Sequence, residues 1–273
     1  IKMTNISTNE KSSKDALTPA SCKTDVTGSL SIEIRKGDCL ELLKDIKSKS
    51  VNLIVTDPPY AIGTTSNGVK GQWSDNNLIR PFFSLLFDEY KRVLKDDGEF
   101  YINTDWRTYP FLYPLLVEKM NVKNCIVWDY EWIKAGSHYR FSHEFIIYGL
   151  KSEGGKRRFS ASLRDVWREK PINFTGDKFH QAEKPIHLIE KMILNSSNEG
   201  DLVLDTFLGS GTTAVACRKN KRNFIGFEIN QLEFVSLGAL VRGDFNTLIR
   251  AGTFALFAGN AKVLTGLRVD GES

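Results

Sequence analysis

Metal-binding and disulfide-forming residues are scarce and scattered in this sequence. Its 273 residues include four cysteines and four histidines, and no two cysteines form a Cys-x-x-Cys pair. Zinc sites and disulfide frameworks need such residues at short, regular spacings. His138 and His143 lie five residues apart in a Gly-Ser-Tyr context, without metal-ligand spacing. We therefore expect no bound metal and a reducing, cytoplasmic location.

Long apolar runs are also missing. No stretch approaches the roughly 20 apolar residues of a transmembrane helix, so we expect no contact with a membrane. Residues 1–29 are rich in Ser, Thr, Lys and Asn and contain no apolar segment, which predicts a flexible leader and not a secretory signal. With 41% hydrophobic and 26% charged residues, the chain has the composition of an ordinary globular protein.

Positive charge is concentrated in one segment. The net charge is +4 and the isoelectric point is near 8.7. Residues 151–170 carry seven Lys or Arg against three Asp or Glu, a surplus that equals the net charge of the whole chain. Such a run is usually a solvated face. Because Phe159 and Trp167 are interleaved with the cations, a nucleic-acid surface is the alternative, since phosphates attract cations and bases stack on flat side chains.

Strands and helices are expected to alternate along the chain. Apolar, β-prone runs predict strands at 30–37, 51–56, 99–104, 124–130, 143–150, 201–205 and 223–229. Helical spacing of apolar residues predicts helices at 38–46, 78–95, 111–120, 185–197 and 214–221. This alternation is typical of an open, mostly parallel α/β sheet.

The stretch "VTDPPY" forms a rigid corner after the strand at 51–56. Asp57 is followed by Pro58, Pro59 and Tyr60. Proline fixes φ, lacks an N–H and restrains the residue before it, so the carbonyl groups here stay free to accept hydrogen bonds from another partner. A stiff strand-to-loop turn would have the same sequence.

A second motif, "LVLDTFLGSGTTAVA", places two glycines between a buried strand and a helix. The pattern Gly209-x-Gly211-x-x-Ala214 satisfies the loose dinucleotide fingerprint, and Glu228 ends the next strand, where it could bind both hydroxyls of a ribose. This combination favours an adenosine-containing ligand over a packed turn. A P-loop is excluded because no Lys-Ser/Thr follows the glycines.

The order of the two motifs resembles the β group of DNA amino-methyltransferases, in which DPPY comes first, then target recognition, then the S-adenosylmethionine loop. The resemblance extends over most of residues 32–229, including "GDCLELLKDIKSKSVNLIVTDPPY", "YKRVLKDDGEFYINTD", "SHEFIIYGLK" and "HQAEKPIHLIEKMILNSSNEGDLVLDTFLGSGTTAVACRKNKRNFIGFEI". Glutamine methyltransferases with an NPPY motif carry the glycine loop before it, so motif order disfavours them. A nicotinamide enzyme normally has this loop near the start of its fold.

The resemblance implies a Rossmann-like methyltransferase fold with a circularly permuted motif order. The expected organisation is a methyltransferase domain at 30–242, a small basic target-recognition segment at 151–180 within it, and a tail or accessory element at 243–273. After Glu228, Phe234 stands where the family has an aromatic residue, but the glycine-rich sequence beyond it departs from the family pattern.

The activity implied is methyl transfer from S-adenosylmethionine to the N6 amine of a flipped-out adenine in double-stranded DNA, as in restriction-modification or orphan phage enzymes. Asp57 and the Pro58 carbonyl would accept the two N–H bonds of the amine, Pro59 would help to fix them, and Tyr60 would stack on the base. A homodimer and a cognate endonuclease are compatible with this activity, which requires neither.

The resemblance also assigns cofactor and DNA contacts. The cofactor residues are Asp38, Lys184, Asp205, Phe207, Gly209, Ser210, Gly211, Thr212, Thr213 and Glu228. The expected DNA contacts are His138, Arg140, Lys156, Arg157, Arg158, Arg164, Trp167 and Arg168. Asp205 would bind the ammonium group of the cofactor and Asp38 its adenine. Asp38 could equally be a helix N-cap, and Lys184 a plain surface lysine.

Two alternatives stay open. One is methylation of cytosine N4, which uses the same acceptor geometry; the family usually has serine there in place of Asp57, so Asp57 favours adenine. The other is a DNA-binding relative that has lost catalysis, which the intact motifs disfavour.

Overall fold

The structure is a computed structural model that describes residues 21–26, 30–60, 65–66, 69–70, 76–134, 138–155, 158–159, 162–171 and 184–230. The strands are β1 (Ser21–Val26), β2 (Leu30–Lys36), β3 (Val51–Thr56), β4 (Thr65–Ser66), β5 (Val69–Lys70), β6 (Leu94–Thr104), β7 (Asn121–Asp129), β8 (His143–Leu150), β9 (Val166–Arg168), β10 (Leu202–Asp205) and β11 (Asn223–Glu228). The helices are α1 (Cys39–Lys44), α2 (Asn76–Val93), α3 (Tyr109–Val117), α4 (Ile186–Ser196) and α5 (Thr212–Lys219).

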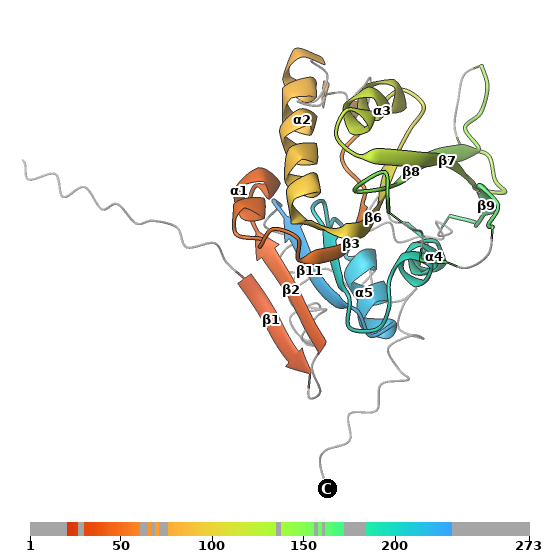
Figure 1. The fold of residues 1–273 in the computed structure, drawn as a ribbon. Helices are drawn as coiled ribbons and strands as arrows, with labels where there is room; N and C mark the ends of the chain where they lie inside the picture. The colour runs from red at the N-terminus through yellow and green to blue at the C-terminus, as the bar shows by residue number, and fades with distance from the viewer. Residues whose placement is uncertain are drawn as a thin grey trace, which may run out of the picture.

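Nine of these strands form one open sheet in the order β1-β2-β11-β10-β3-β6-β8-β7-β9 (Figure 1). The ladders from β2 through β11, β10 and β3 to β6 are all parallel. Strand β8 runs antiparallel to both β6 and β7, and β9 pairs parallel with β7. The predicted open, mostly parallel α/β sheet is confirmed, with element ends shifted by a few residues.

One part of the expected leader is a strand. Residues 21–26 form β1, which pairs antiparallel with β2 at the edge of the sheet. Its sequence, SCKTDV, is mostly polar, and its two apolar residues, Cys22 and Val26, are too few to mark a strand. The expected leader therefore contains a strand that the sequence did not indicate, because main-chain pairing with an edge strand needs no strong hydrophobic signal.

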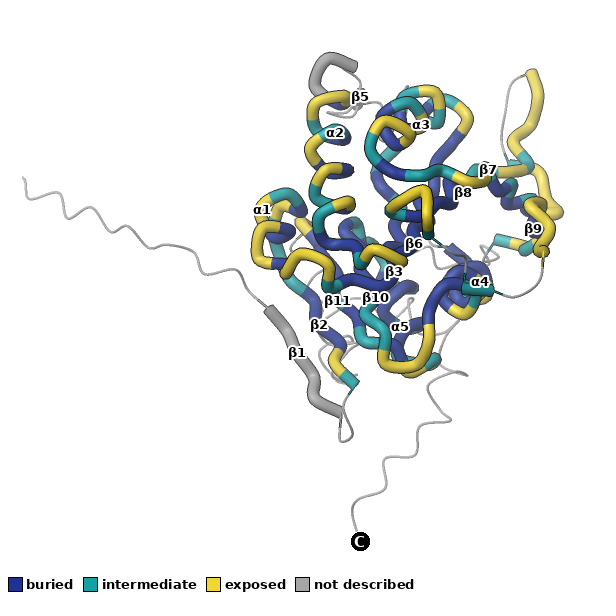
Figure 2. Tube along the Cα trace, in the orientation of Figure 1, coloured by how far each residue is buried: buried dark blue, intermediate teal, exposed yellow. Residues whose placement is uncertain are grey.

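Helices cover both faces of the sheet (Figures 1 and 2). One hydrophobic core packs α1, α2 and α3 against one face, and the other packs α4 and α5 against the opposite face. All six residues of β3 are buried between these layers, as its continuous apolar sequence predicts for a central parallel strand. Among the described residues, no helix is long and apolar enough to cross a membrane.

The parallel strands bring both sequence motifs to one edge of the sheet. Strands β3, β10 and β11 end at Thr56, Asp205 and Glu228, and carboxyl ends of parallel strands share an edge. Strand β6 ends there too, and because β8 is antiparallel to it, β8 begins there. Residues more than 100 positions apart in sequence can therefore meet at this edge, which we call the carboxyl edge.

Close packing beside Gly149 in β8 gives a stability prediction. A Cβ at this position would lie 2.6 Å from the Asn121 carbonyl oxygen and would overlap the Phe100 ring. Gly149→Ala is therefore expected to lower the free energy of unfolding by about 1–3 kcal/mol, measured by urea denaturation. Gly154→Ala is the control, since nothing lies within 4 Å of its Cβ position. Equal denaturation midpoints for the two variants would contradict the prediction.

Candidate active site at the carboxyl edge of the sheet

The DPPY corner holds a carboxylate with one engaged and one unengaged oxygen. Asp57 directly follows β3, whose last residue, Thr56, accepts a hydrogen bond on its carbonyl from the Asn103 amide at 3.1 Å. Asp57 Oδ2 accepts from Lys184 Nζ at 2.6 Å. Asp57 Oδ1 is buried and has no hydrogen-bond partner within the described part of the chain. The corner therefore presents a free acceptor beside a charge-paired one.

Lys184 is buried against this corner and is not a surface lysine. Besides Asp57, its ammonium group lies 3.0 Å from Glu144 Oε2 and 3.2 Å from the Tyr60 hydroxyl. The Tyr60 hydroxyl in turn donates to Glu144 Oε2 at 2.8 Å. Because these three acceptors match its three N–H donors, the contacts place Lys184 at the DPPY corner and leave no donor over for the cofactor contact that the sequence predicts.

Charge pairing opposes burial in this cluster. Burial raises the pKa of Asp57, and the charge of Lys184 works against that rise. Burial would also raise the pKa of Glu144, but attraction to Lys184 and Lys134 outweighs it and holds that pKa at about 2. Burial and the neighbouring carboxylates raise the pKa of Tyr60 well above its ordinary value. At neutral pH, Tyr60 therefore keeps its proton and Glu144 is ionised.

Glu144 is absent from the residues that the sequence predicts for the site. It is the second residue of β8, inside the stretch "SHEFIIYGL", and its partners lie far away in sequence. The Tyr130 hydroxyl donates to its Oε1 at 2.5 Å, and Lys134 Nζ lies 3.3 Å from the same oxygen. The available signal was an acidic residue at the start of an apolar strand that begins at the carboxyl edge.

The glycine loop between β10 and α5 has the backbone that its sequence predicts. Gly209 and Gly211 have φ angles of +51° and +83°, in the left-handed region where glycine carries no Cβ penalty. The Gly209 N–H donates to Glu228 Oε2 at 2.9 Å, so the end of β11 holds the loop. A Cβ built on Gly209 would meet no atom within 4 Å, which leaves open space over the loop.

Asp205 joins the two motifs. Its carboxylate accepts from the hydroxyls of Thr56 at 2.8 Å and Thr213 at 2.7 Å, and from the Phe207 N–H at 3.1 Å. Burial raises the pKa of Asp205 to about 6, against the pull of these donors. Through these contacts Asp205 fixes the glycine loop to the end of β3. The ammonium contact that the sequence predicts for Asp205 would have to share a carboxylate that already accepts three hydrogen bonds.

The remaining predicted cofactor residues surround the same loop. The Ser210 and Thr212 hydroxyls lie 3.1 Å apart, and the Phe207 ring contacts Phe82. Asp38 is the N-cap of α1, where its Oδ1 accepts from the Leu40 N–H at 2.8 Å. The preceding Gly37 N–H donates to the Glu228 carbonyl, so the N-cap also lies beside the end of β11.

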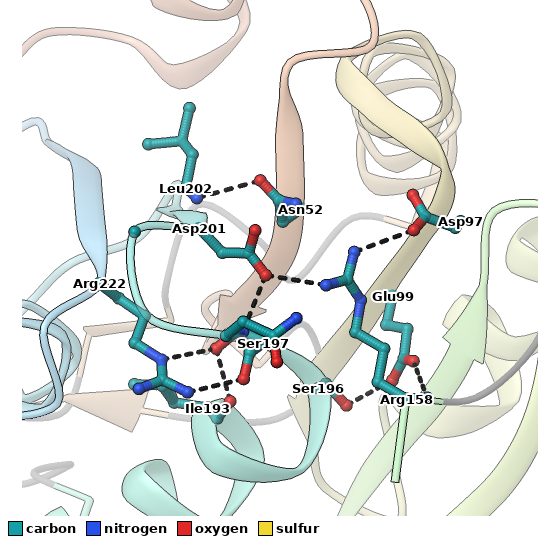
Figure 3. Close-up of polar contacts among 12 residues, drawn as sticks. Asn52, Asp97, Glu99, Arg158, Ile193, Ser196, Ser197, Asp201, Leu202 and Arg222 are labelled. Carbon is teal, nitrogen blue, oxygen red and sulfur yellow. Dashed lines mark hydrogen bonds and ion pairs between the residues drawn. The ribbon is translucent and has the colours of Figure 1, made fainter.

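Two of the predicted DNA contacts lie elsewhere. Arg158 is bound by Asp201 at 2.8 Å and Asp97 at 3.0 Å (Figure 3). These two carboxylates lie near the amino ends of β10 and β6, whereas Asp57 follows the carboxyl end of β3. Trp167 is 3% exposed, and its indole N–H donates to the Arg164 carbonyl. Both residues thus have partners within the protein, which the sequence did not indicate because charge and aromaticity do not reveal which face of a short segment is buried.

The other predicted DNA contacts are exposed or lie outside the described residues. His138 and Arg140 are exposed between β7 and β8, at the carboxyl edge, and Arg164 and Arg168 are exposed around β9. Lys156 and Arg157 lie outside the described residues. The sequence prediction missed Tyr139, whose side chain is 93% exposed between His138 and Arg140.

The position of Arg158 gives a second prediction. Arg158→Ala is expected to lower the free energy of unfolding by about 1–3 kcal/mol, because it removes charge-assisted hydrogen bonds to half-buried Asp201. Arg164→Ala, at an exposed position, is the matched control and should leave the thermal midpoint unchanged. If Arg158→Ala left stability intact and instead reduced the salt dependence of DNA binding, Arg158 would be a phosphate contact after all.

Comparison with known proteins yields one family. A family model described as DNA methylase (N6_N4_Mtase) matches residues 51–236. The DNA adenine methyltransferase YhdJ of Escherichia coli (strain K12) is 32% identical over 235 residues, which cover 74% of this chain and 79% of that protein. The PvuII DNA methyltransferase (cytosine-N4-specific) structure is 19% identical, with a TM-score of 0.66 over 80% of this chain and 91% of its own. The M1.HpyAVI–SAM complex is 26% identical, with a TM-score of 0.58 over 78% and 98%.

Proposed function

This chain belongs to the DNA methylase family of the N6/N4 type, and from that premise we propose that it methylates the N6 amine of adenine in double-stranded DNA, with S-adenosylmethionine as the methyl donor. The observation that carries the proposal is Asp57 Oδ1, a buried carboxylate oxygen without a described partner at a rigid corner. Such an acceptor fits an N–H group of the substrate. Site-specific modification of the restriction-modification type is the activity we infer.

The DPPY corner supplies what an exocyclic amine lacks. The lone pair of this amine is delocalised into the base, which makes the nitrogen a poor nucleophile. In our proposal Asp57 Oδ1 and the Pro58 carbonyl accept its two N–H bonds and draw the nitrogen towards tetrahedral geometry. Pro58 and Pro59 hold the acceptors in place, so little reorganisation is needed during the reaction.

Tyr60 and Asp57 complete the roles at the corner. The Tyr60 hydroxyl is held by Glu144, so its ring has a fixed position from which to stack on a base extruded from the duplex. Methylation leaves a positive charge on the amine nitrogen. Asp57 stabilises that charge, accepts the proton that the nitrogen must lose, and releases it to solvent.

The residues around the glycine loop fit S-adenosylmethionine. When bound, this cofactor supplies a methyl group attached to a positively charged sulfonium sulfur. After the transfer, that sulfur is part of a neutral thioether, which is a good leaving group. The open space over Gly209 lets a ligand approach the backbone, and α5 directs its first N–H groups at the same place. Glu228 would hold the ribose hydroxyls, and the Ser210 and Thr212 hydroxyls would lie near the methionine carboxylate.

Adenine is our choice of base on the strength of Asp57. Members of the resembled family that act on cytosine N4 usually carry serine at the position of Asp57. The adenine methyltransferase YhdJ, at 32% identity, supports the same choice. The exposed His138, Tyr139 and Arg140 at the carboxyl edge support a DNA substrate, because Arg140 offers a cation to phosphates and Tyr139 a flat ring to bases.

Mass spectrometry of nucleosides tests the proposal directly. The purified chain is incubated with S-adenosylmethionine and mixed-sequence duplex DNA, and the DNA is digested to nucleosides. N6-methyladenine is the expected product. N4-methylcytosine would overturn the choice of base and keep the mechanism. Absence of any methylated base, from folded protein that binds S-adenosylmethionine by calorimetry, would contradict the proposed activity.

A further inference from the structure

Lys184 is the centre of a buried ionic cluster that includes Asp57. It comes just before α4, and its side chain is 8% exposed. Its ammonium group contacts Asp57, Glu144 and the Tyr60 hydroxyl, one acceptor for each N–H. It also lies 5.4 Å from the centre of the Tyr60 ring. A buried ammonium is stable only when it is paired in this way, so the arrangement is costly to rebuild after any change.

Glu144 holds that cluster together from the other side. Its two oxygens receive the Tyr60 and Tyr130 hydroxyls and the ammonium groups of Lys184 and Lys134. It sits on β8, whereas Tyr60 lies in the DPPY corner, Tyr130 and Lys134 follow β7, and Lys184 precedes α4, so three other segments converge on this carboxylate. Truncation of Glu144 would leave several buried donors without an acceptor.

We propose that Lys184 and Glu144 are positioning residues for methyl transfer: Lys184 keeps Asp57 ionised and fixes its Oδ2, and Glu144 fixes Lys184 and the Tyr60 hydroxyl, so that, of the two Asp57 oxygens, Oδ1 is the one that faces the amine. This inference rests on the proposed function. It assigns to Lys184 a role towards the base-binding corner instead of towards the cofactor, and it adds Glu144 to the site.

Charge balance explains why both residues are needed. Among the residues that the structure describes, the groups that face Asp57 are Lys184, Glu144, Tyr60, Tyr130 and Asp205. Lys184 is the one cation among them. Without it, two neighbouring carboxylates would share a buried space, and one would take up a proton. Asp57 is the one to do so, because Glu144 keeps Lys134 as a charged partner, whereas Lys184 is the one described cation beside Asp57.

Loss of the charge on Asp57 has a definite consequence for the reaction. A protonated carboxyl group is a weaker acceptor, and it neither stabilises the positive charge that develops on the amine nitrogen nor accepts the proton that leaves it. The chemical step should suffer and cofactor binding should not. The kcat of the wild type should fall at low pH as Asp57 is protonated, and removal of Lys184 should move that fall to higher pH, since it raises the pKa of Asp57 further.

Lys184→Met is the primary test, with Lys191→Met as the matched control. Lys191 lies on α4 in the same neighbourhood, and its ammonium group packs over Trp167, away from Asp57. We expect Lys184→Met to lower kcat by about 100-fold, to leave the Kd for S-adenosylmethionine within about threefold of the wild type, and to shift the acidic limb of the kcat–pH profile upward by about one unit or more. Lys191→Met should match the wild type.

Conservative variants keep the test decisive if Lys184→Met fails to fold. Lys184→Arg retains the charge and should keep the acidic limb near its wild-type pH while it loses part of kcat. Glu144→Gln retains an acceptor for Tyr60 and should lose less activity than Glu144→Ala. An unchanged kcat and pH profile in both Lys184 variants would overturn the inference.

Two further outcomes are distinguishable. If Lys184→Met weakened S-adenosylmethionine binding by more than about tenfold at unchanged kcat, Lys184 would be a cofactor ligand and our assignment would be wrong. If the wild type itself produced no methylated base, the proposed function would fail before any variant is compared. The inference therefore fails separately from the activity on which it rests.

Discussion

Asp57→Asn is expected to reduce the rate of methyl transfer by about 1000-fold or more, the largest effect of any single change that the structure suggests. The side chain keeps its shape but loses the negative charge that lies beside the reacting nitrogen. The amide group can also turn a donor towards the amine, which has donors of its own. Transfer of radiolabelled methyl groups to mixed-sequence DNA measures this loss.

The matched control for Asp57→Asn is Asp96→Asn. Asp96 is exposed near the start of β6, where it pairs with Lys49 and Lys151 at the opposite edge of the sheet. This variant should retain wild-type activity. Asp57→Asn should still bind S-adenosylmethionine, because Asp57 touches Lys184 and not the glycine loop. Activity within tenfold of the wild type would show that Asp57 does not hold the amine.

Glu228→Ala should have the second largest effect, on cofactor affinity. In our assignment its carboxylate binds two ribose hydroxyls, and the structure shows it accepting from the backbone N–H groups of Gly209 at 2.9 Å and Asn230 at 2.7 Å. Loss of charge-assisted hydrogen bonds should cost about 2–4 kcal/mol of binding free energy, or roughly 100-fold in the Kd for S-adenosylmethionine. Isothermal titration calorimetry measures this change.

Glu199→Ala is the control for Glu228→Ala. Glu199 is exposed in the turn before β10, paired with Lys221. Glu199→Ala should bind the cofactor with the wild-type Kd. The Kd of Glu228→Gln should fall between those of the wild type and Glu228→Ala. If the Kd of Glu228→Ala were unchanged, the ribose would have to bind at another part of the carboxyl edge. The two substitutions of acidic residues therefore separate two roles: Asp57→Asn should slow methyl transfer, and Glu228→Ala should weaken S-adenosylmethionine binding.

The fold could be predicted largely because its signals are local. Four of the six residues of β3 are apolar, and this run identifies a strand buried on both faces without knowledge of its neighbours. Gly209 and Gly211 have the left-handed backbone that a tight turn before a helix requires. Strand β1 could not be found this way, since its polar sequence gains order only from main-chain pairing with β2.

The site was predictable only where its chemistry lies within one short segment. Asp57, the prolines and Tyr60 are contiguous, so their common purpose is visible in the sequence. The contact of Lys184 with Asp57 spans 127 positions, and that of Glu144 with Tyr60 spans 84. Nothing in either local sequence specifies such a partner. Arg158 shows the same limit, because its binding to Asp201 depends on where the chain returns to the sheet.

The bridge made by Asp205 determines which parts of this protein could be exchanged with a relative. Thr56 ends the strand that leads into the DPPY corner, and Thr213 belongs to the helix that follows the glycine loop. A chimaera that imports only one of these segments breaks the three-residue contact and leaves a buried carboxylate short of a donor. The smallest transplantable unit is therefore both loops together with Asp205, although Thr56 and Asp205 are 149 positions apart in the sequence.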